Sequence, residues 1–237
     1  NSVILQRDGK ILIAGFSSSN GSNCDIALAR YNCDGSLDTS FDADGKVISG
    51  LYQDSYVQAY SVTIQVDGKI LVAGYTISND SDFALVRYNR DGSLDSSFDI
   101  DGKVITDFGS SNDCGVDVTV QSDGKILVAG YTHNPSTGNG NFALVRYNED
   151  GTLDTSFDAD GKVITDFGGQ DVGRSVIVQS DGKILVAGGS MGNNGSYSYT
   201  VGRYNGDGLL DTSFDMDGRV TVGFRKVIRR KMKKFGF

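Results

Sequence analysis

The amino-acid sequence predicts an all-β fold, a β-propeller, from three observations. Among 30 acidic residues only Glu149 is a glutamate, and the others are Asp, whose short side chain bonds to nearby backbone amides and favours turns. One sequence pattern recurs four times along the chain. Short runs within each copy are apolar on both faces, which is typical of sheets packed between other sheets rather than of a two-sheet sandwich.

The repeat divides the chain into four units of about 58 residues. The motif Asp-Gly-Lys recurs at spacings of 59, 56 and 58 residues, starting at Asp8, Asp67, Asp123 and Asp181. The units are expected at about 2–60, 61–115, 116–174 and 175–224. The remaining segment, 225–237, holds seven Lys or Arg and no acidic residue, so we expect a disordered end or a truncated next blade.

Each unit is expected to form four antiparallel strands, here called a, b, c and d. In the second unit these are 61–65, 69–75, 83–89 and 103–108. Asp67-Gly68 predicts a tight hairpin between strands a and b. The polar run 76–82 predicts the b to c loop, and the segment 90–101, dense in Asp, Ser and Gly, predicts the c to d connection.

The burial pattern orders the strands within a blade. In strand b, Ile70 and Val72 point to one face while Leu71 and Ala73 point to the other, so both faces are apolar. Strand a alternates apolar with small or polar residues, which suits the innermost strand beside a central channel, and strand d is then the outer edge. Four blades predict an open arc or part of a larger ring, with a closed four-blade ring as the alternative. An open arc is expected to expose Leu12 and Val201 on its end blades and to invite self-association.

The motifs DGKILVAGY, DFALVRYN, DGSLDSSFD and DGKVITDF of the second unit, repeated in phase in the other three, resemble the delta-60 repeat family. The strand order is similar to that of kelch blades, although the kelch Trp is absent. The resemblance implies a propeller within larger, often secreted or surface-associated bacterial proteins, and it implies no catalytic activity. Where many family members would have Gly, this sequence repeats Asp, at Asp42, Asp99, Asp158 and Asp215.

Catalytic signals are weak in the sequence. His133 is the single histidine and lies in a long b to c loop without a sequence-evident partner. The three cysteines, at Cys24, Cys33 and Cys114, have no partner histidine or nearby cation, so we expect inert thiols. We therefore expect a protein that is not an enzyme and that has no resident cofactor.

Repeated Asp-x-Asp-Gly segments are the candidate metal ligands. They comprise Asp42, Asp44, Asp99, Asp101, Asp158, Asp160, Asp215 and Asp217. Calcium prefers several oxygen ligands on a flexible loop, whereas Asx turns closing the c to d connection explain the same residues without an ion. The arginines at Arg30, Arg87, Arg146 and Arg203 precede a tyrosine in strand c, and we expect them to bond carbonyls or Asp of the c to d loops.

Net charge restricts the partners. The chain carries −8, of which the basic end contributes +7, so the body carries −15 and a nucleic-acid partner for it is not expected. No apolar run reaches the length of a membrane span. The a to b and c to d connections nearly repeat between units, whereas the b to c and d to a connections vary. Varied loops on a common scaffold predict a partner-binding face there, with candidate contacts at Asn79, Asp80, His133, Asn139, Asn193 and Tyr197.

Three function classes remain open at this point. The preferred interpretation is a non-enzymatic propeller module for protein interaction or structural scaffolding. The alternatives are a carbohydrate- or calcium-binding lectin-like propeller and, third, a hydrolase or lyase on the same scaffold. A protein or a glycan is therefore the expected partner, and a secreted or cell-surface bacterial protein is the expected setting.

Overall fold

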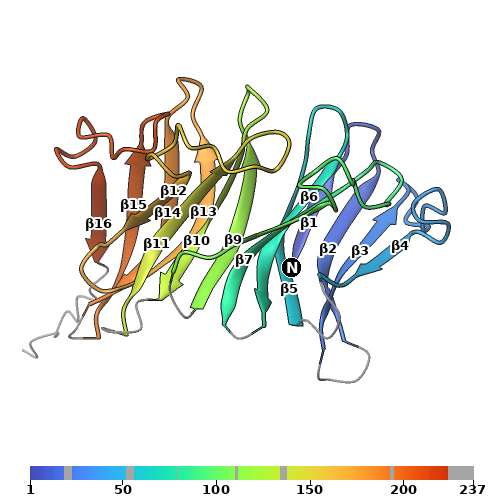
Figure 1. The fold of residues 1–237 in the computed structure, drawn as a ribbon, viewed down its shortest axis with the longest axis horizontal. Helices are drawn as coiled ribbons and strands as arrows, with labels where there is room; N and C mark the ends of the chain where they lie inside the picture. Colours follow the sequence, from blue (N-terminus) through green and yellow to red (C-terminus); the bar gives the residue numbers. More distant parts are fainter. Residues whose placement is uncertain are drawn as a thin grey trace, which may run out of the picture.

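The computed structural model describes residues 1–18, 23–51, 56–78, 80–109, 112–133, 138–192 and 195–223 (Figure 1). These residues form sixteen β-strands and no helix. The strands are β1 (Ser2–Leu5), β2 (Ile11–Ser17), β3 (Asp25–Tyr31), β4 (Lys46–Ser49), β5 (Tyr56–Ile64), β6 (Ile70–Ile77), β7 (Ser81–Tyr88), β8 (Lys103–Thr106), β9 (Asn112–Val120), β10 (Ile126–His133), β11 (Gly140–Tyr147), β12 (Lys162–Thr165), β13 (Gln170–Val178), β14 (Ile184–Met191), β15 (Tyr197–Tyr204) and β16 (Arg219–Gly223). Within that part of the chain, no helix is available to cross a membrane.

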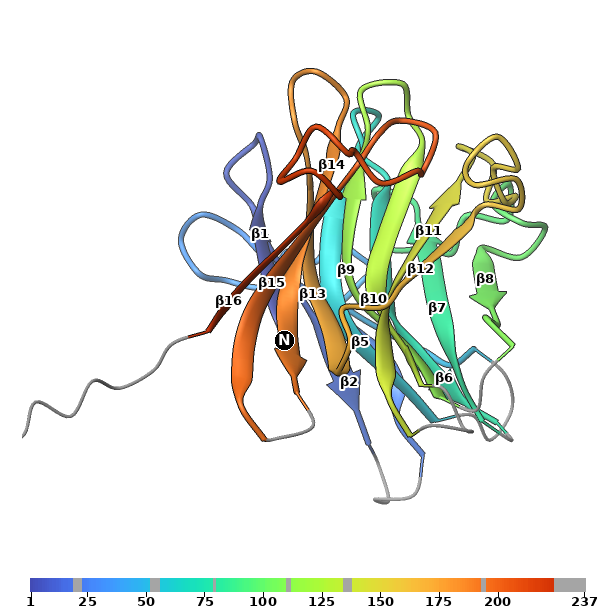
Figure 2. The ribbon, with the colours of Figure 1, turned by 90° about the vertical axis from the view of Figure 1, so that its left-hand side faces the viewer.

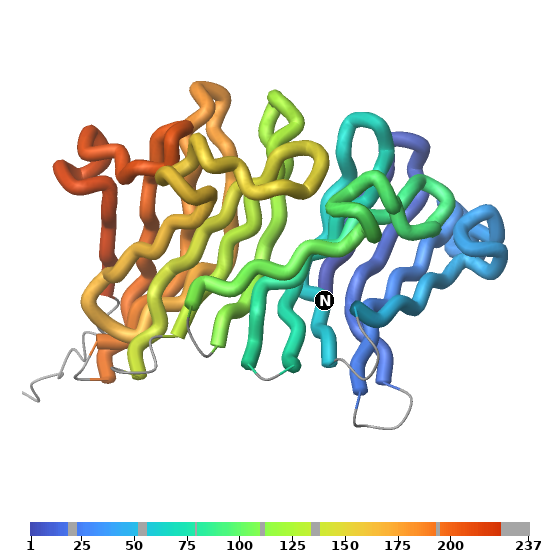
Figure 3. Tube along the Cα trace, in the orientation of Figure 1, coloured from blue at the N-terminus to red at the C-terminus, as the bar shows by residue number. Residues whose placement is uncertain are grey.

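Each repeat folds into one antiparallel sheet whose strands pair in chain order, as predicted. The sheets are β1 to β4, β5 to β8, β9 to β12 and β13 to β16, here called blades 1 to 4. A single parallel pair, Ser81 with Asn112, joins blades 2 and 3. Figures 1 and 3 show blades 1 and 4 at opposite ends of an arc, and no strand pairing among the described residues closes that arc into a ring.

The a to b hairpins contain one more residue than a two-residue turn. In blade 2 the Gly68 amide donates to the Gln65 carbonyl at 2.9 Å and the Gln65 amide donates to the Lys69 carbonyl at 2.9 Å. Gly68 has φ +86°, so the loop is a type I turn followed by a left-handed glycine that forms a G1 bulge. The Asp67 carboxylate accepts from the Lys69 amide at 3.0 Å, which explains the repeated Asp.

The inner strands begin earlier than predicted. Strand β5 starts at Tyr56, five residues before the expected Ser61, and its register with β6 shifts between Ala59 and Ser61. Equivalent shifts occur in β9 and β13. A β-bulge reverses the inside-outside alternation of a strand, so the alternating pattern that marks Ser61 to Gln65 does not extend upstream. The predicted unit boundaries at 60/61, 115/116 and 174/175 therefore fall inside the inner strands.

Three hydrophobic cores lie between neighbouring blades. The core between blades 1 and 2 packs Leu12 and Ala14 against Val62 and Val72. The other two cores repeat this arrangement between blades 2 and 3 and between blades 3 and 4. The prediction that Leu12 is exposed on the open end is wrong, because Leu12 is fully buried against blade 2. The side chain on the outer face of β2 is instead its neighbour Ile13, which is 40% exposed.

A buried ionic cluster recurs in every blade and confirms the expected role of the strand c arginines. In blade 2 the Arg87 Nε donates to Asp95 Oδ2 at 2.6 Å, and the Lys69 Nζ lies 2.9 Å from the same oxygen. Arg87 also stacks over the Phe98 ring at 4.3 Å and donates from Nη1 to the Glu149 carbonyl of blade 3 at 2.5 Å. In blades 1 to 3 the repeated arginine therefore bonds both its own c to d loop and the next blade.

Candidate functional site

A hollow of about 540 Å³ opens on the face that carries the b to c and d to a connections. It lies between the inner strands of blades 2, 3 and 4 and the ends of their neighbouring strands. The side chains that give it chemical character are Tyr60, Tyr75, Tyr131, His133 and Arg174. Three tyrosines and an arginine in one concave surface form the kind of patch that anchors a ligand or a partner side chain.

The bulges position the residues that point into this hollow. The residue skipped by the strand pairing is Tyr60 in β5, Val116 in β9 and Arg174 in β13. All three line the hollow. The same backbone feature in three blades therefore presents three different side chains to one space, so the scaffold repeats while the chemistry does not.

Burial controls the ionisation of the tyrosines. The Tyr60 and Tyr75 rings stack with centroids 5.8 Å apart and an interplanar angle of 21°. Burial raises the pKa of the Tyr75 and Tyr131 hydroxyls well above the usual range, with a smaller effect from the neighbouring Cys114. Both phenols are therefore neutral at physiological pH and present an aromatic ring with a hydroxyl donor.

Cys114 does not have the properties of a nucleophile. Burial raises the pKa of its thiol to about 11, and a hydrogen bond with Tyr131 and the positive charge of Arg174 lower it only in part. The thiol is therefore protonated at neutral pH, and a thiolate is the reactive form. Arg174 lines the same hollow as Cys114 and Tyr131.

Asp117 fixes the three inner strands relative to one another. Its Oδ1 accepts from the Ser61 hydroxyl of blade 2 at 2.7 Å. Its Oδ2 accepts from the Ser175 hydroxyl at 3.0 Å and from the Val176 amide of blade 4 at 2.9 Å. Since Ser61 and Ser175 directly follow the bulged Tyr60 and Arg174, this carboxylate links the strand segments next to both bulges.

An acidic cluster borders the hollow between blades 2 and 3. Carboxylate oxygens of Asp82, Asp107 and Asp113 lie within 4.8 Å of one another. Burial raises the pKa of Asp82 to about 6, and the charges of Asp80, Asp107 and Asp113 add to the effect. Asp113 is fully buried and accepts from the Phe108 amide at 2.7 Å, so it closes the d to a turn. Its equivalent Asp171 accepts from the Phe167 amide at 2.6 Å in the same way.

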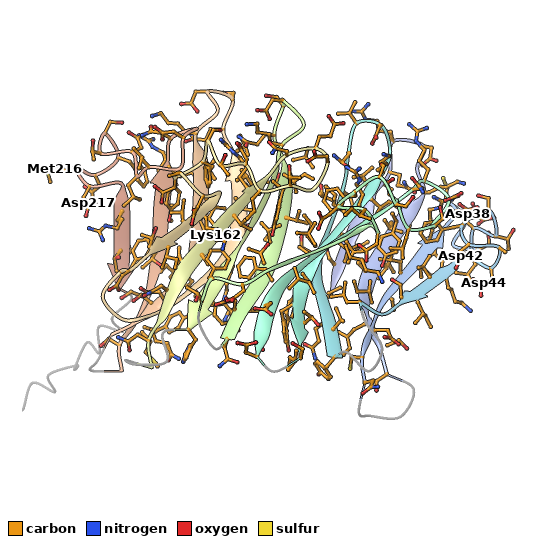
Figure 4. All side chains as sticks on the ribbon, in the orientation of Figure 1. Asp38, Asp42, Asp44, Lys162, Met216 and Asp217 are labelled. Atoms are coloured by element: carbon orange, nitrogen blue, oxygen red, sulfur yellow. The ribbon has the colours of Figure 1, made fainter. Side chains whose placement is uncertain are left out.

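The predicted calcium ligands lie elsewhere, on the c to d loops at the outer rim. Asp42 and its neighbour Ala43 both have left-handed φ angles, and the Asp44 carboxylate accepts from the Lys46 amide at 2.8 Å. Figure 4 places Asp42 and Asp44 at one end of the molecule and Asp217 at the other. Of the eight predicted ligands, all within the described part of the chain, none belongs to a cluster of three ligand side chains. The turn geometry agrees with the Asx-turn interpretation of these residues.

The predicted partner contacts are only partly brought together. His133 lines the hollow and Asn139 lies on the opposite side of the same b to c connection. Asp80 lies close to Asp82, and Tyr197 is 52% exposed on blade 4 with its ring edge-on to Tyr199. Asn79 and Asn193 lie outside the described residues. The bulged Tyr60 and Arg174, which the sequence interpretation missed, lie in the hollow.

A second hollow, of about 970 Å³, lies on the opposite face at the a to b hairpins. Equivalent glutamines from three blades, Gln65, Gln121 and Gln179, line it. Each of these glutamines begins a hairpin by donating its backbone amide to the Lys carbonyl four residues later. The backbone bond explains the repeated hairpin but not the repeated Gln side chain, because the Oε1 atoms of Gln65, Gln121 and Gln179 are buried without a hydrogen-bond partner among the described residues.

The family comparison matches all four repeats. A family model described as "Domain of unknown function (DUF5122) beta-propeller" matches residues 6–41, 65–98, 121–157 and 179–214, more than half of the chain. These segments run from the a to b hairpin into the second half of the c to d loop, so they contain the hairpin glycine and the Arg-Asp pair of each blade. A search of curated proteins gave no match.

Solved structures show the same fold at low sequence identity. A protein of unknown function from Dyadobacter fermentans is 13% identical, with a TM-score of 0.56 over 89% of this chain and 66% of that one. A Hadza microbial sialidase is 12% identical, with a TM-score of 0.53 over 94% of this chain and 45% of that one. A PL25 ulvan lyase is 13% identical, with a TM-score of 0.51 over 96% and 57%. The chain thus spans about half to two thirds of the length of these structures.

Proposed function

The chain belongs to the DUF5122 β-propeller family, and we propose that it is a non-enzymatic binding module for a protein partner, with its site at the tyrosine-lined hollow. The repeats are of the delta-60 type that their motifs resemble. The proposed setting is a secreted or surface-associated bacterial protein, as in that family.

The observation that carries the proposal is that the bulge recurs in the backbone of three blades while the side chain at the bulge differs in each. A feature needed only for folding is expected to keep its residue from blade to blade, as the left-handed hairpin glycines do. The bulged position instead presents Tyr60, Val116 and Arg174 to one hollow. Tyr and Arg are the residue types that most often dominate the binding energy of protein interfaces.

The chemistry of the hollow supports binding over catalysis. The Cys114 thiol is protonated at neutral pH, and Asp113 is occupied by the Phe108 amide. A nucleophile or a general base needs a positioned partner and an accessible reactive form. Among the described residues of the hollow, the hydrolase or lyase alternative would therefore depend on His133 and the tyrosine hydroxyls.

A second candidate is an acidic saccharide. Arg174 is exposed and lines the same hollow as three tyrosines. A sugar ring packs on an aromatic face while a guanidinium pairs with a carboxylate or sulfate. This candidate shares the hollow with the first and differs in the class of ligand.

Two library screens test the proposal, one with displayed random peptides and one with an array of neutral and acidic glycans. The variant Tyr131→Ala with Arg174→Ala removes the hollow's ring and charge. The matched control, Ser122→Ala with Ser180→Ala, changes two side chains that line the hollow on the opposite face. We expect peptide binding that is weakened at least tenfold by the first pair and left unchanged by the control.

Other outcomes of the two screens have defined meanings. Binding to acidic glycans alone, lost with the same pair, selects the second candidate. Ligands whose binding is insensitive to Tyr131 and Arg174 but is lost in the control pair would place the site on the opposite face and refute the proposal.

A further inference from the structure

Every junction between neighbouring blades uses the same pair of apolar faces. The downstream face of a blade presents a leucine and an alanine of strand b, as Leu12 and Ala14 do in blade 1. The upstream face of the next blade presents a valine from each of strands a and b, as Val62 and Val72 do. The equivalent residues pack in the other two junctions. The downstream face of each of the first three blades therefore fits the upstream face of the next blade in the same way.

Polar links accompany these faces and also repeat. An amide of the c to d loop donates to the next blade, as in Asp42 to the Asp91 carbonyl at 2.7 Å, Asp99 to Asp150 at 2.9 Å and Asp158 to Asp207 at 2.8 Å. A hydroxyl of strand d meets a strand c tyrosine of the next blade, as in Thr106 with Tyr147 at 2.6 Å and Tyr204 with Thr165 at 2.8 Å. The strand c arginine donates from Nη1 to the next blade in each of the three junctions.

Blade 4 presents the same downstream face except for one polar link, because Val222 stands where Ser49, Thr106 and Thr165 carry a hydroxyl. This face is not used within the described chain. Ala187 is exposed, whereas Ala14, Ala73 and Ala129 at the same position are fully buried. Arg203 donates to its own Asp211 at 2.7 Å, but among the described residues it makes no Nη1 bond of the kind that the other three arginines make. The Phe214 ring is only half-buried, whereas its three equivalents are fully buried under a glycine of the next blade. Figure 2 looks onto this end of the molecule.

Blade 1 presents the matching upstream face. Val3 is 65% exposed, whereas its equivalents Val62, Val118 and Val176 are at most 6% exposed. A Cβ at Gly35 would meet no atom within 4 Å, whereas one at Gly92 would meet the Phe41 ring of the preceding blade at 3.1 Å. Tyr31 is half-buried and has no strand d hydroxyl opposite it in the described residues, unlike the tyrosines of the other three blades.

We infer that blade 4 of one copy docks onto blade 1 of a second copy, and that two such junctions close a ring of eight blades. The occupant of each end is thus a second copy of this chain, held by Arg203, Phe214 and Ala187 on one side and by Tyr31, Gly35 and Val3 on the other. The Arg203 guanidinium donates to the Cys33 carbonyl, which occupies the position of the Arg90 carbonyl that Arg30 bonds.

Two copies are favoured over other numbers by the blade count. A contact between two different faces is heterologous and ends only when the assembly closes on itself. Propellers generally have four to eight blades, and two copies of the 237-residue chain, which carries four, supply eight. The count is a property of this 237-residue polypeptide. This inference concerns the end blades and leaves the hollow between blades 2, 3 and 4 untouched, so it stands independently of the proposed binding function.

The test uses the full 237-residue chain with one charge placed in each face, as Val3→Glu and Ala187→Glu. Both positions are exposed in the single chain, so folding is expected to persist, and circular dichroism with thermal unfolding checks this. Sedimentation velocity over a hundredfold range of concentration measures the mass. We expect the parent chain at twice 25.3 kDa and each variant alone as a single copy. An equimolar mixture of the two variants retains one intact junction and is expected to recover association.

A matched control and the contrary outcomes complete the test. Val66→Glu changes an a to b hairpin residue that is 85% exposed and lies outside both faces, so it is expected to leave the mass unchanged. A parent chain that stays single at every concentration would overturn the inference. A dimer that survives in either single variant would show that like faces pair, and a mass that keeps growing with concentration would show that the ring does not close. If a variant fails to fold, Arg203→Gln removes the guanidinium that bonds the Cys33 carbonyl and is expected to weaken the association, whereas Tyr31→Phe is not, because Val222 offers its hydroxyl no partner.

Discussion

At the scale of single residues, the glycine in strand b is required by the bulge opposite it. The bulged strand turns a carbonyl toward its partner, and a Cβ on the partner would stand 1.9 Å from the Gln58 oxygen at Gly74, 1.8 Å from the Cys114 oxygen at Gly130 and 2.0 Å from the Val172 oxygen at Gly188. The repeated Ala-Gly of the sequence is therefore explained by the backbone path that also aims Tyr60 and Arg174. Fold and site depend on the same local geometry.

The substitution Gly130→Ala tests this requirement. The new methyl group has backbone at 1.8 Å and the Phe83 ring at 3.0 Å, so the two strands must separate, and we expect a loss of about 3 kcal/mol in the free energy of unfolding. Urea denaturation measures it. The control Gly206→Ala, where a Cβ meets nothing within 4 Å, is expected to change stability by less than about 0.5 kcal/mol. Equal effects of the two substitutions would contradict the steric explanation.

Asp82 gives a pH dependence of a defined sign. Its pKa is raised to about 6 in the folded state, from 3.8, chiefly by burial and then by the neighbouring Asp charges. The folded state binds this proton more tightly, so the contribution to stability is present at low pH and is lost as the pH rises from about 4 to about 6. Asp82→Asn removes this loss, and we expect the variant to unfold at a higher temperature than the parent at pH 7. The difference should vanish near pH 3, and a variant less stable than the parent at pH 7 would show that the carboxylate is needed.

At the scale of strands, the sequence predicted the strands and turns within a blade better than the contacts between strands and between blades. The fourfold repeat, the order of strands a to d and the hairpins all follow from periodicity and turn chemistry. The start of β5 could not be read, because the bulge at Tyr60 reverses the alternation. The face of Leu12 was misassigned, because strand b is apolar on both sides and alternation alone does not say which neighbour each side meets. The hollow was missed for the same reason as the bulge, since the residues that form it lie where periodicity fails.

The contribution of the ionic cluster to stability can be tested by comparing the arginine of blade 2 with the equivalent arginine of blade 4. Arg87 bonds Asp95, stacks on Phe98 and reaches blade 3, and it is almost fully buried. Arg87→Ala leaves the Asp95 charge with Lys69 alone, and we expect a loss of roughly 3 kcal/mol or more in the free energy of unfolding. Arg203→Ala removes a more exposed arginine that makes no bond to a further blade within the described chain. Chemical denaturation of the two variants at low protein concentration should show a clearly smaller loss for Arg203→Ala, and equal losses would mean that the bond between blades contributes nothing.

At the scale of the whole molecule, stability and binding are assigned to different parts of the blades. The three internal junctions repeat the same apolar faces and the same polar links, so each blade is held chiefly by its neighbours rather than by one central core. The hollow uses the inner strands, where the repeated backbone carries unlike side chains. Changes in the hollow can therefore alter what is bound with little effect on the junctions, which is the arrangement expected of a scaffold with variable specificity.

Acid unfolding should involve the whole molecule, because all four blades contain the same buried carboxylate. In Asp38 the hydrogen bonds from Lys10 and Ser40 hold the pKa well below its usual range, and in Asp95 burial acts in the opposite direction but is outweighed by Lys69, Ser97 and Arg87. Asp154 and Asp211 are shifted in the same direction. A depressed folded-state pKa stabilises the protein above the unfolded value of 3.8, and this contribution is lost as the pH falls below about 4.

We expect the unfolding temperature to drop steeply between pH 4 and pH 2, as one transition seen alike by circular dichroism and tyrosine fluorescence. Asp95→Asn, with one carboxylate fewer, should start from a lower temperature at pH 6 and fall less steeply. An unfolding temperature that stays level from pH 5 to pH 2 would show that these four carboxylates do not stabilise the fold.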